Sequence, residues 1–187
     1  MQKATFISAH IIRHARPADI PAIRTMQERS MRVLGSEFYT SNEINNFLNL
    51  FGTMDDIVVD EGHYFVAEDH RGTILGSGGW SRSRPGYAKP AAAIESPANP
   101  PTVRSMFVDP AFTRRGIATA IMARTERDAL EQGIDTLHLT ATLSGLALYE
   151  AFGYHTEQTT ALQFPDMSSF ACVKMRKSLA SPQIRTA

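Results

Sequence analysis

One strand–helix–strand pattern in the second half of the chain constrains the fold most. Residues 103–108 form a strand-like run that ends at Asp109, and residues 137–141 alternate like a second strand. Between them, apolar side chains recur at helical spacing from near Arg115 to Gly133, a residue type that commonly ends a helix. Strands joined by a helix usually run parallel, with a right-handed crossover. We therefore expect one parallel strand pair with a helix against the sheet.

The rest of the chain predicts antiparallel strands and amphipathic helices. Further helices are expected from Asp19 as N-cap to Gly35, from Ser41 to Gly52 and over residues 146–152, and further strands over residues 11–15, 63–67, 73–76, 159–164 and 171–175. The predicted fold class is α/β in the α+β sense. It has a central mixed, mostly antiparallel, twisted sheet of about six to seven strands, flanked by about four helices.

Glycines interrupt the strand that begins near residue 73. Gly76, Gly78 and Gly79 come close together there, and Trp80 follows at once. Glycine inside a strand marks a bulge or the close approach of another backbone. We expect one of these two features here, with Trp80 either filling the core or lining a cleft.

Length and composition favour one globular domain. The chain has 187 residues, of which 43% are hydrophobic and 20% are charged, and both values are ordinary for globular proteins. We interpret residues 1–187 as a single domain with a core over residues 11–176, a proline-rich loop over residues 82–101 and a tail over residues 178–187.

The balance of charges argues against nucleic acids and anionic membranes as partners, and the small numbers of cysteines and histidines argue against disulfides and metal sites. Lys plus Arg and Asp plus Glu both number 19, whereas nucleic acids and anionic membranes select a basic excess. No stretch approaches the ~18 apolar residues of a membrane helix, and no secretory leader is evident, so a cytoplasmic location is expected. Cys172 is the one cysteine, and the six histidines form no His-x-x-x-His pair. No disulfide and no metal site are therefore expected.

The link into the central helix carries the clearest sign of chemistry. It reads Val108-Asp109-Pro110-Ala111-Phe112-Thr113-Arg114-Arg115-Gly116-Ile117-Ala118-Thr119. A helix start presents unpaired N–H groups and a positive dipole end, the small Gly116 lets a ligand approach, and the two arginines add donors for phosphate. This predicts a pyrophosphate site; the alternative is an ordinary helix start with solvated arginines. The Walker loop and the dinucleotide fingerprint are both missing.

A second motif follows about thirty residues later, as Leu148-Tyr149-Glu150-Ala151-Phe152-Gly153-Tyr154. Together the two segments resemble the GCN5-related N-acetyltransferases. That family has an acyl-CoA motif, Val-x-Pro followed by Arg/Gln-x-x-Gly-x-Gly/Ala, and a later motif, Leu-Tyr-x-x-x-Gly-Phe/Tyr. The first reads here as Val108-Asp109-Pro110 and Thr113-Arg114-Arg115-Gly116-Ile117-Ala118. The order of elements matches the family from about residue 11 to residue 175.

The resemblance implies a V-shaped cleft between the two central parallel strands. The pantetheine arm of acetyl-CoA would lie there like an extra strand, and the pyrophosphate would rest on the helix start. The implied cofactor-binding residues are Met106, Phe107, Val108, Arg114, Arg115, Gly116, Ile117, Ala118 and Thr119.

The resemblance also implies a reaction. The chain would be an acyl-CoA-dependent N-acyltransferase, with acetyl as the expected group, acting on a primary amine of a small molecule or a protein. The amine would attack the thioester directly, and Tyr149 would donate a proton to the departing thiolate, as a phenol of pKa about 10 is able to do at neutral pH. The alternative role for Tyr149 is a packed helix aromatic. Many family members dimerise, so a homodimer stays open.

Three positions depart from the family pattern. Thr113 stands where Arg or Gln is usual, Thr142 where many members have Asn, and Thr102 about where some carry a catalytic Glu. The general base is therefore left open among Glu95, Glu37 and His63. The same departures motivate an alternative function, a non-catalytic acyl-CoA-binding sensor or interaction module; a nucleotide-binding protein is a third hypothesis.

Overall fold

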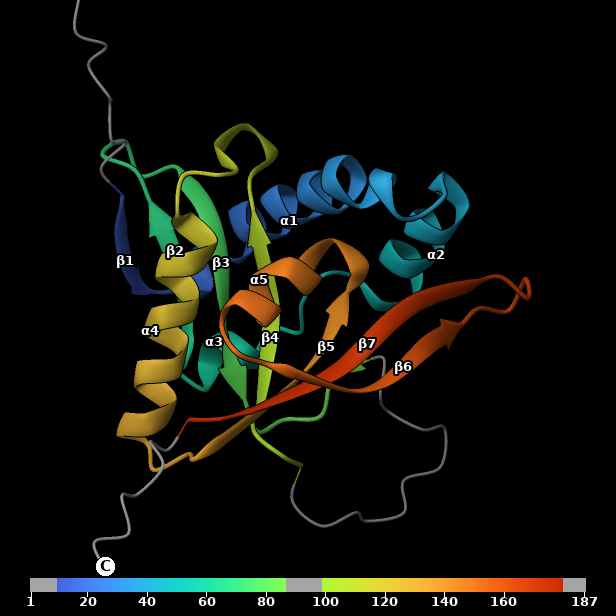
Figure 1. Ribbon diagram of the computed structural model, residues 1–187. Coiled ribbons are helices and arrows are strands. Elements are labelled where there is room, and N and C mark those ends of the chain that lie inside the picture. Colours follow the sequence, from blue (N-terminus) through green and yellow to red (C-terminus); the bar gives the residue numbers. More distant parts are fainter. Residues whose placement is uncertain (1–9, 87–98, 180–187) are drawn as a thin grey trace, which may run out of the picture.

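A single seven-stranded sheet organises the computed structural model, which describes residues 10–86 and 99–179. The strands are β1 (Ile11–His14), β2 (Tyr64–Glu68), β3 (Ile74–Ser81), β4 (Thr102–Val108), β5 (Thr136–Thr142), β6 (His155–Gln163) and β7 (Ser169–Ser178). Their order is β1-β2-β3-β4-β5-β7-β6 (Figure 1). β4 and β5 are parallel, and all other neighbours are antiparallel. The mixed, mostly antiparallel sheet is thus confirmed.

Helices cover both faces of this sheet. They are α1 (Ile20–Leu34), α2 (Ser41–Phe51), α3 (Ile57–Asp60), α4 (Ile117–Glu131) and α5 (Leu146–Ala151). In β2, Val66 packs in one hydrophobic cluster with Ile23 of α1, while the next residue, Ala67, packs with Ile121 of α4. Because successive strand residues point to opposite faces, α1 and α4 lie on opposite sides of the sheet (Figure 1).

Both features that the glycines of β3 predict, a bulge and the close approach of another backbone, are present in the structure. The register between β3 and β4 shifts between Ser77 and Gly79, which is a bulge. A Cβ atom at Gly78 would lie 2.7 Å from the Met106 sulfur, and one at Gly79 would lie 2.6 Å from the Tyr64 Cα. The close approach of the β2 backbone therefore requires glycine at position 79, whereas at position 78 an added Cβ would displace the flexible Met106 side chain opposite the bulge.

The structure corrects the expected N-cap of the first helix and confirms that the helix ends at Gly35. Asp19 precedes α1 but makes no side-chain cap to it. Its carboxylate instead accepts hydrogen bonds from the Arg16 N–H at 2.8 Å and from Arg13 at 2.7 Å. At the other end, Gly35 keeps a right-handed φ of −71°, so the chain continues as a 3-10 turn over Gly35–Glu37. The sequence did not predict α3, because a helix of four residues is too short to show a periodic pattern of apolar side chains.

Two further boundaries differ from the sequence-based expectations. β3 continues through Trp80, which is 1% exposed, and its indole donates to Asp128 at 2.7 Å, so Trp80 fills the core. β7 runs to Ser178, so the expected tail begins later. The greater part of the proline-rich loop and the end of the tail lie outside the described residues.

Within residues 10–86 and 99–179, no helix is long and apolar enough to cross a membrane.

Cys172 is expected to stay unreactive while the protein is folded. It lies on β7 in a cluster with Tyr39 and Phe170, and burial raises the pKa of its thiol to about 11. Because the thiolate is the reactive form, the neutral thiol should not react at pH 8. Ellman's reagent should find no fast thiol in the folded protein and one after denaturation in urea. A fast reaction of the folded protein would contradict the burial of Cys172.

Candidate active site

The two central parallel strands part almost as soon as they meet. β4 and β5 are paired at a single position, Thr102 opposite His138, and the His138 N–H donates to the Pro101 carbonyl at 3.0 Å. Every other neighbouring pair is matched over at least four positions. Beyond Thr102 the edges of β4 and β5 therefore face a gap, as the resemblance implies.

A cavity of about 520 Å³ occupies this gap and reaches both faces of the sheet. Met31, Leu34, Phe47 and Phe51 line it from α1 and α2; Gly116, Ala118 and Thr119 line it from the start of α4; and Thr142 and Tyr149 line it beside α5. Since α1 and α4 lie on opposite faces, the cavity passes through the sheet between β4 and β5. Two ligands that enter from opposite faces would meet there.

The start of α4 forms one end of the cavity. The first helical hydrogen bond runs from the Ala120 N–H to the Gly116 carbonyl at 2.9 Å, so the N–H groups of residues 117–119 have no acceptor within the helix. Gly116 has a φ of 77° and Arg114 a φ of 61°, and both are left-handed. This turn carries the chain from β4 into α4 and leaves the N–H groups and the positive dipole end available to an anion.

The buried carboxylate of Asp109 stabilises the turn between β4 and α4. Asp109 is 2% exposed, accepts a hydrogen bond from the Ala111 N–H at 3.0 Å and pairs with Arg29 of α1. This ion pair connects the segment before α4 with α1, which lies on the opposite face of the sheet. Asp109 of the Val-x-Pro motif thus holds the turn before α4 in place.

All but one of the nine predicted cofactor-binding residues line the cavity. The exception is Arg115, whose exposed guanidinium lies 5.1 Å from the Phe112 ring centre, outside the described lining. The pattern of two adjacent arginines did not reveal which would face the cavity. In the structure Arg114, which has a left-handed φ, is the one that lines it.

Tyr149 is part of the cavity wall. It belongs to α5, is 8% exposed, and meets Tyr154 edge-on with ring centres 5.9 Å apart. Gly145 admits the ring, because a Cβ atom there would lie 3.0 Å from the Tyr149 ring. The placement fits the predicted role, and it also shows that the ring is packed on one side.

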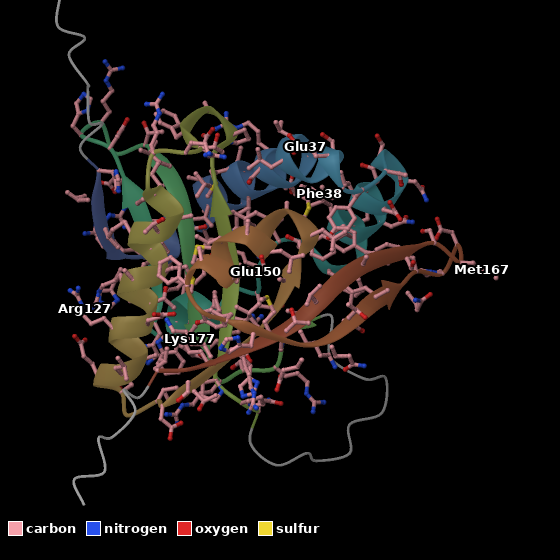
Figure 2. The ribbon with its side chains drawn as sticks, viewed as in Figure 1. Glu37, Phe38, Arg127, Glu150, Met167 and Lys177 are labelled. Atoms are coloured by element: carbon pink, nitrogen blue, oxygen red, sulfur yellow. The ribbon has the colours of Figure 1, made fainter. Side chains whose placement is uncertain are left out.

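Of the three candidate bases, the two that the structure describes, Glu37 and His63, are not among the residues that line this cavity. Glu95 lies outside the described residues. Glu37 is exposed beyond the end of α1 (Figure 2). His63 binds Asp128 through Nδ1 at 2.8 Å, stacks on Trp80 with ring centres 4.3 Å apart, and lines a separate hollow beside Glu61.

Sequence analysis missed an ion pair in the cavity wall. Asp55 pairs with Arg104 at 2.6 Å, and Asp55 also accepts a hydrogen bond from the Gly86 N–H at 3.0 Å. Among the described lining residues, Asp55 is the single carboxylate. It follows α2 in a polar link with no motif around it, so no local signal marked it. No described group of three His, Cys, Asp or Glu residues is placed to hold a metal ion.

Comparison with known proteins agrees with this geometry. A family model described as an acetyltransferase (GNAT) domain matches residues 60–156, which include β2 to α5 and both motifs. No curated protein sequence matches the chain. The match covers the split strands, the start of α4 and Tyr149.

Solved structures share the fold at low sequence identity. A GCN5-related N-acetyltransferase from Rhodopseudomonas palustris has a TM-score of 0.68 at 16% identity, over 94% of this chain and 99% of that one. The PaiA N-acetyltransferase from Thermoplasma acidophilum, in complex with coenzyme A, has a TM-score of 0.67 at 14% identity, and the match covers 91% of this chain and 99% of that one. An acetyltransferase from Salmonella typhimurium with acetyl-CoA has a TM-score of 0.61 at 15% identity, over 94% and 96%.

Proposed function

The chain belongs to the GNAT acetyltransferase family, and from that membership we propose that it transfers an acetyl group from acetyl-CoA to a primary amine. The observation that carries this proposal is the cavity between β4 and β5, which joins the start of α4 to Tyr149 and opens to both faces of the sheet. Acetyl-CoA enters from the α4 side, and the amine enters from the side of α1 and α2.

The cofactor follows the unpaired edge of β4. A pantetheine arm has two amides, so it pairs with a strand edge as a peptide does. Met106 and Val108 supply main-chain groups along that edge, and the pyrophosphate accepts hydrogen bonds from the N–H groups of residues 117–119. Arg114 adds a positive charge at the same end.

The reaction is a direct displacement in a ternary complex. The amine nitrogen forms a bond to the thioester carbon, and the carbonyl oxygen takes the negative charge while the Met106 N–H donates to it. The C–S bond then breaks, the sulfur leaves as a thiolate, and Tyr149 gives it a proton. The amine loses one proton, which passes to the Asp55 carboxylate through water. Asp55 then releases this proton to solvent, and the Tyr149 phenolate takes one from solvent when coenzyme A leaves.

Ligand-dependent stability tests the cofactor. A ligand at a hundred times its Kd adds about 2.7 kcal/mol of stability, which raises Tm by roughly 5–10 °C for a domain of this size. Acetyl-CoA and coenzyme A are expected to give this shift, and ATP and NAD are not. Equal shifts with ATP or NAD would favour the nucleotide-binding hypothesis, and no shift with millimolar coenzyme A would overturn the proposal.

Two glycines at opposite ends of α4 provide a matched pair of variants. Gly116 and Gly133 have φ values of 77° and 73°, and neither has an atom within 4 Å of an added Cβ. Gly116→Asp puts a negative charge at the anion site and should lose most of the coenzyme A shift. Gly133→Asp carries the same charge and the same backbone strain at the far end, and should keep the shift.

A binding module without turnover is the second candidate. Thr113 and Thr142 replace residues that the family uses, and the one described carboxylate in the cavity wall is already paired with Arg104. Acetyl-CoA and a panel of primary amines separate the two functions, because an enzyme releases free thiol and a sensor does not. A coenzyme A shift without thiol release would favour the sensor.

A further inference from the structure

A buried polar network lies beneath the bulge in β4. Tyr64 of β2, Gln27 of α1 and Ser77 of β3 are each at most 1% exposed. The Gln27 side-chain amide donates to the Tyr64 hydroxyl at 2.8 Å and to the Ser77 hydroxyl at 3.0 Å. These three residues come from three different elements and converge on one point of the sheet.

That point is the carbonyl group of Ser105. The Tyr64 hydroxyl donates to it at 2.7 Å, and the Gln27 amide lies 3.4 Å from it. Burial raises the pKa of the Tyr64 phenol, so the hydroxyl keeps the proton that it donates. The bulge carbonyl thus takes its hydrogen bonds from side chains of two other elements.

Ser105 itself is held in an uncommon conformation. Its φ is 47°, in the left-handed region that non-glycine residues rarely occupy. Its hydroxyl donates to the Thr53 carbonyl at 2.7 Å, on the link that follows α2. Such a conformation persists only where the surroundings hold it, and here the hydroxyl and the carbonyl are both held.

The next peptide group in the chain is the one that the proposed reaction uses. Because the peptide is planar and trans, the Met106 N–H points away from the Ser105 carbonyl. The carbonyl points to Tyr64 and Gln27, so the Met106 N–H points to the other side, and Met106 lines the cavity. Gly78 leaves room for the Met106 side chain, whose sulfur would lie 2.7 Å from a Cβ at position 78.

We propose that Tyr64 and Gln27 are positioning residues for acetyl transfer: they hold the Ser105 carbonyl and thereby aim the Met106 N–H at the thioester oxygen of bound acetyl-CoA. The inference rests on the proposed function. It assigns a catalytic consequence to two buried side chains, one from α1 and one from β2, that do not line the described cavity.

Backbone NMR of methionine tests the proposal without knowledge of the amine. The chain has eight methionines, so ¹⁵N-methionine labelling gives a simple amide spectrum, in which Met106→Leu identifies the Met106 signal. Adding acetyl-CoA should move the Met106 amide proton in the wild type. Tyr64→Phe removes only the hydroxyl and should reduce that movement by at least half, and Gln27→Met should reduce it by a smaller fraction.

Tyr39→Phe is the matched control. The Tyr39 hydroxyl is also buried and donates to a backbone carbonyl, that of Ala171 at 2.8 Å, away from the bulge. This variant should lose a comparable amount of stability and keep the full Met106 movement. Once an amine is known, Tyr64→Phe should lower kcat about tenfold with an unchanged KM for acetyl-CoA, which a loss of stability alone would not do.

The outcomes separate the two proposals. If acetyl-CoA gives no thermal shift, the proposed function fails and this inference fails with it. If acetyl-CoA binds but the wild-type Met106 signal does not move, or if Tyr64→Phe and Gln27→Met both keep the full movement, the cofactor proposal stands and the positioning role is overturned. Should Tyr64→Phe fail to fold, Gln27→Met alone decides.

Discussion

Tyr149→Phe is expected to lower kcat about 100-fold, within the usual range for losing a general acid, and to leave the Kd of acetyl-CoA within about twofold. In the proposed mechanism the hydroxyl gives a proton to the departing thiolate, so its loss raises the barrier to that departure. The contacts expected to bind the cofactor lie on β4 and at the start of α4, and the substitution leaves them intact. A 100-fold loss corresponds to about 2.7 kcal/mol of activation free energy.

The measurement pairs thiol release with calorimetric binding of acetyl-CoA. Tyr154→Phe is the control, because its ring packs edge-on against Tyr149 and is not among the described residues that line the cavity; it should retain kcat within about threefold. An unchanged kcat in Tyr149→Phe would remove this residue from the mechanism. An equal loss in both variants would mean that ring packing, and not proton donation, is the property that matters.

Gly79→Ala is expected to cost about 3 kcal/mol of folding stability and to lower Tm by roughly 6–12 °C. Gly79 lies in the middle of β3, paired with Tyr64 on one side and Arg104 on the other. An added Cβ would press on the His63 carbonyl and lie 2.6 Å from the Tyr64 Cα. These are backbone atoms, so they can move away only if the β2–β3 pairing opens.

Gly35→Ala provides the comparison. Its φ of −71° suits alanine, and the nearest atom to an added Cβ is the flexible Met31 sulfur at 3.3 Å. It should stay within about 1 kcal/mol of the wild type. The melting temperatures of the two variants test this prediction. If the Tm of Gly79→Ala is no lower than that of Gly35→Ala, the backbones of β2 and β3 leave room for a Cβ atom at position 79, and the prediction is wrong.

Much of the fold could be predicted because its signals are local. The parallel pair follows from a strand–helix–strand pattern, and α2 follows from apolar spacing between Ser41 and Gly52. The bulge followed from glycines in β3, where a Cβ has no room. Asp19 was misjudged because Arg13, on a different element, takes its carboxylate. Trp80 stayed undecided because its partner, Asp128, lies 48 residues away.

The residues of the candidate site also fall into two groups, those with a local signal in the sequence and those without one. Gly116 was visible because a small residue stands at a helix start, and Tyr149 because the motif around it resembles that of the family. The structure brings both to one cavity. Asp55 and Tyr64 were invisible because each acts on a residue distant in the sequence, Arg104 and Ser105 respectively.

The sequence by itself determined the order of elements and the position of the helix start that follows Gly116, since these depend on neighbouring residues, and its two motifs carried the family resemblance. Only the tertiary structure decided that Arg114 and not Arg115 faces the cavity, that an Asp55–Arg104 pair lines it, and that a network centred on Tyr64 holds the β4 bulge. Those features depend on which side chains meet when the sheet assembles. Such contacts between distant segments leave no periodic pattern in the chain.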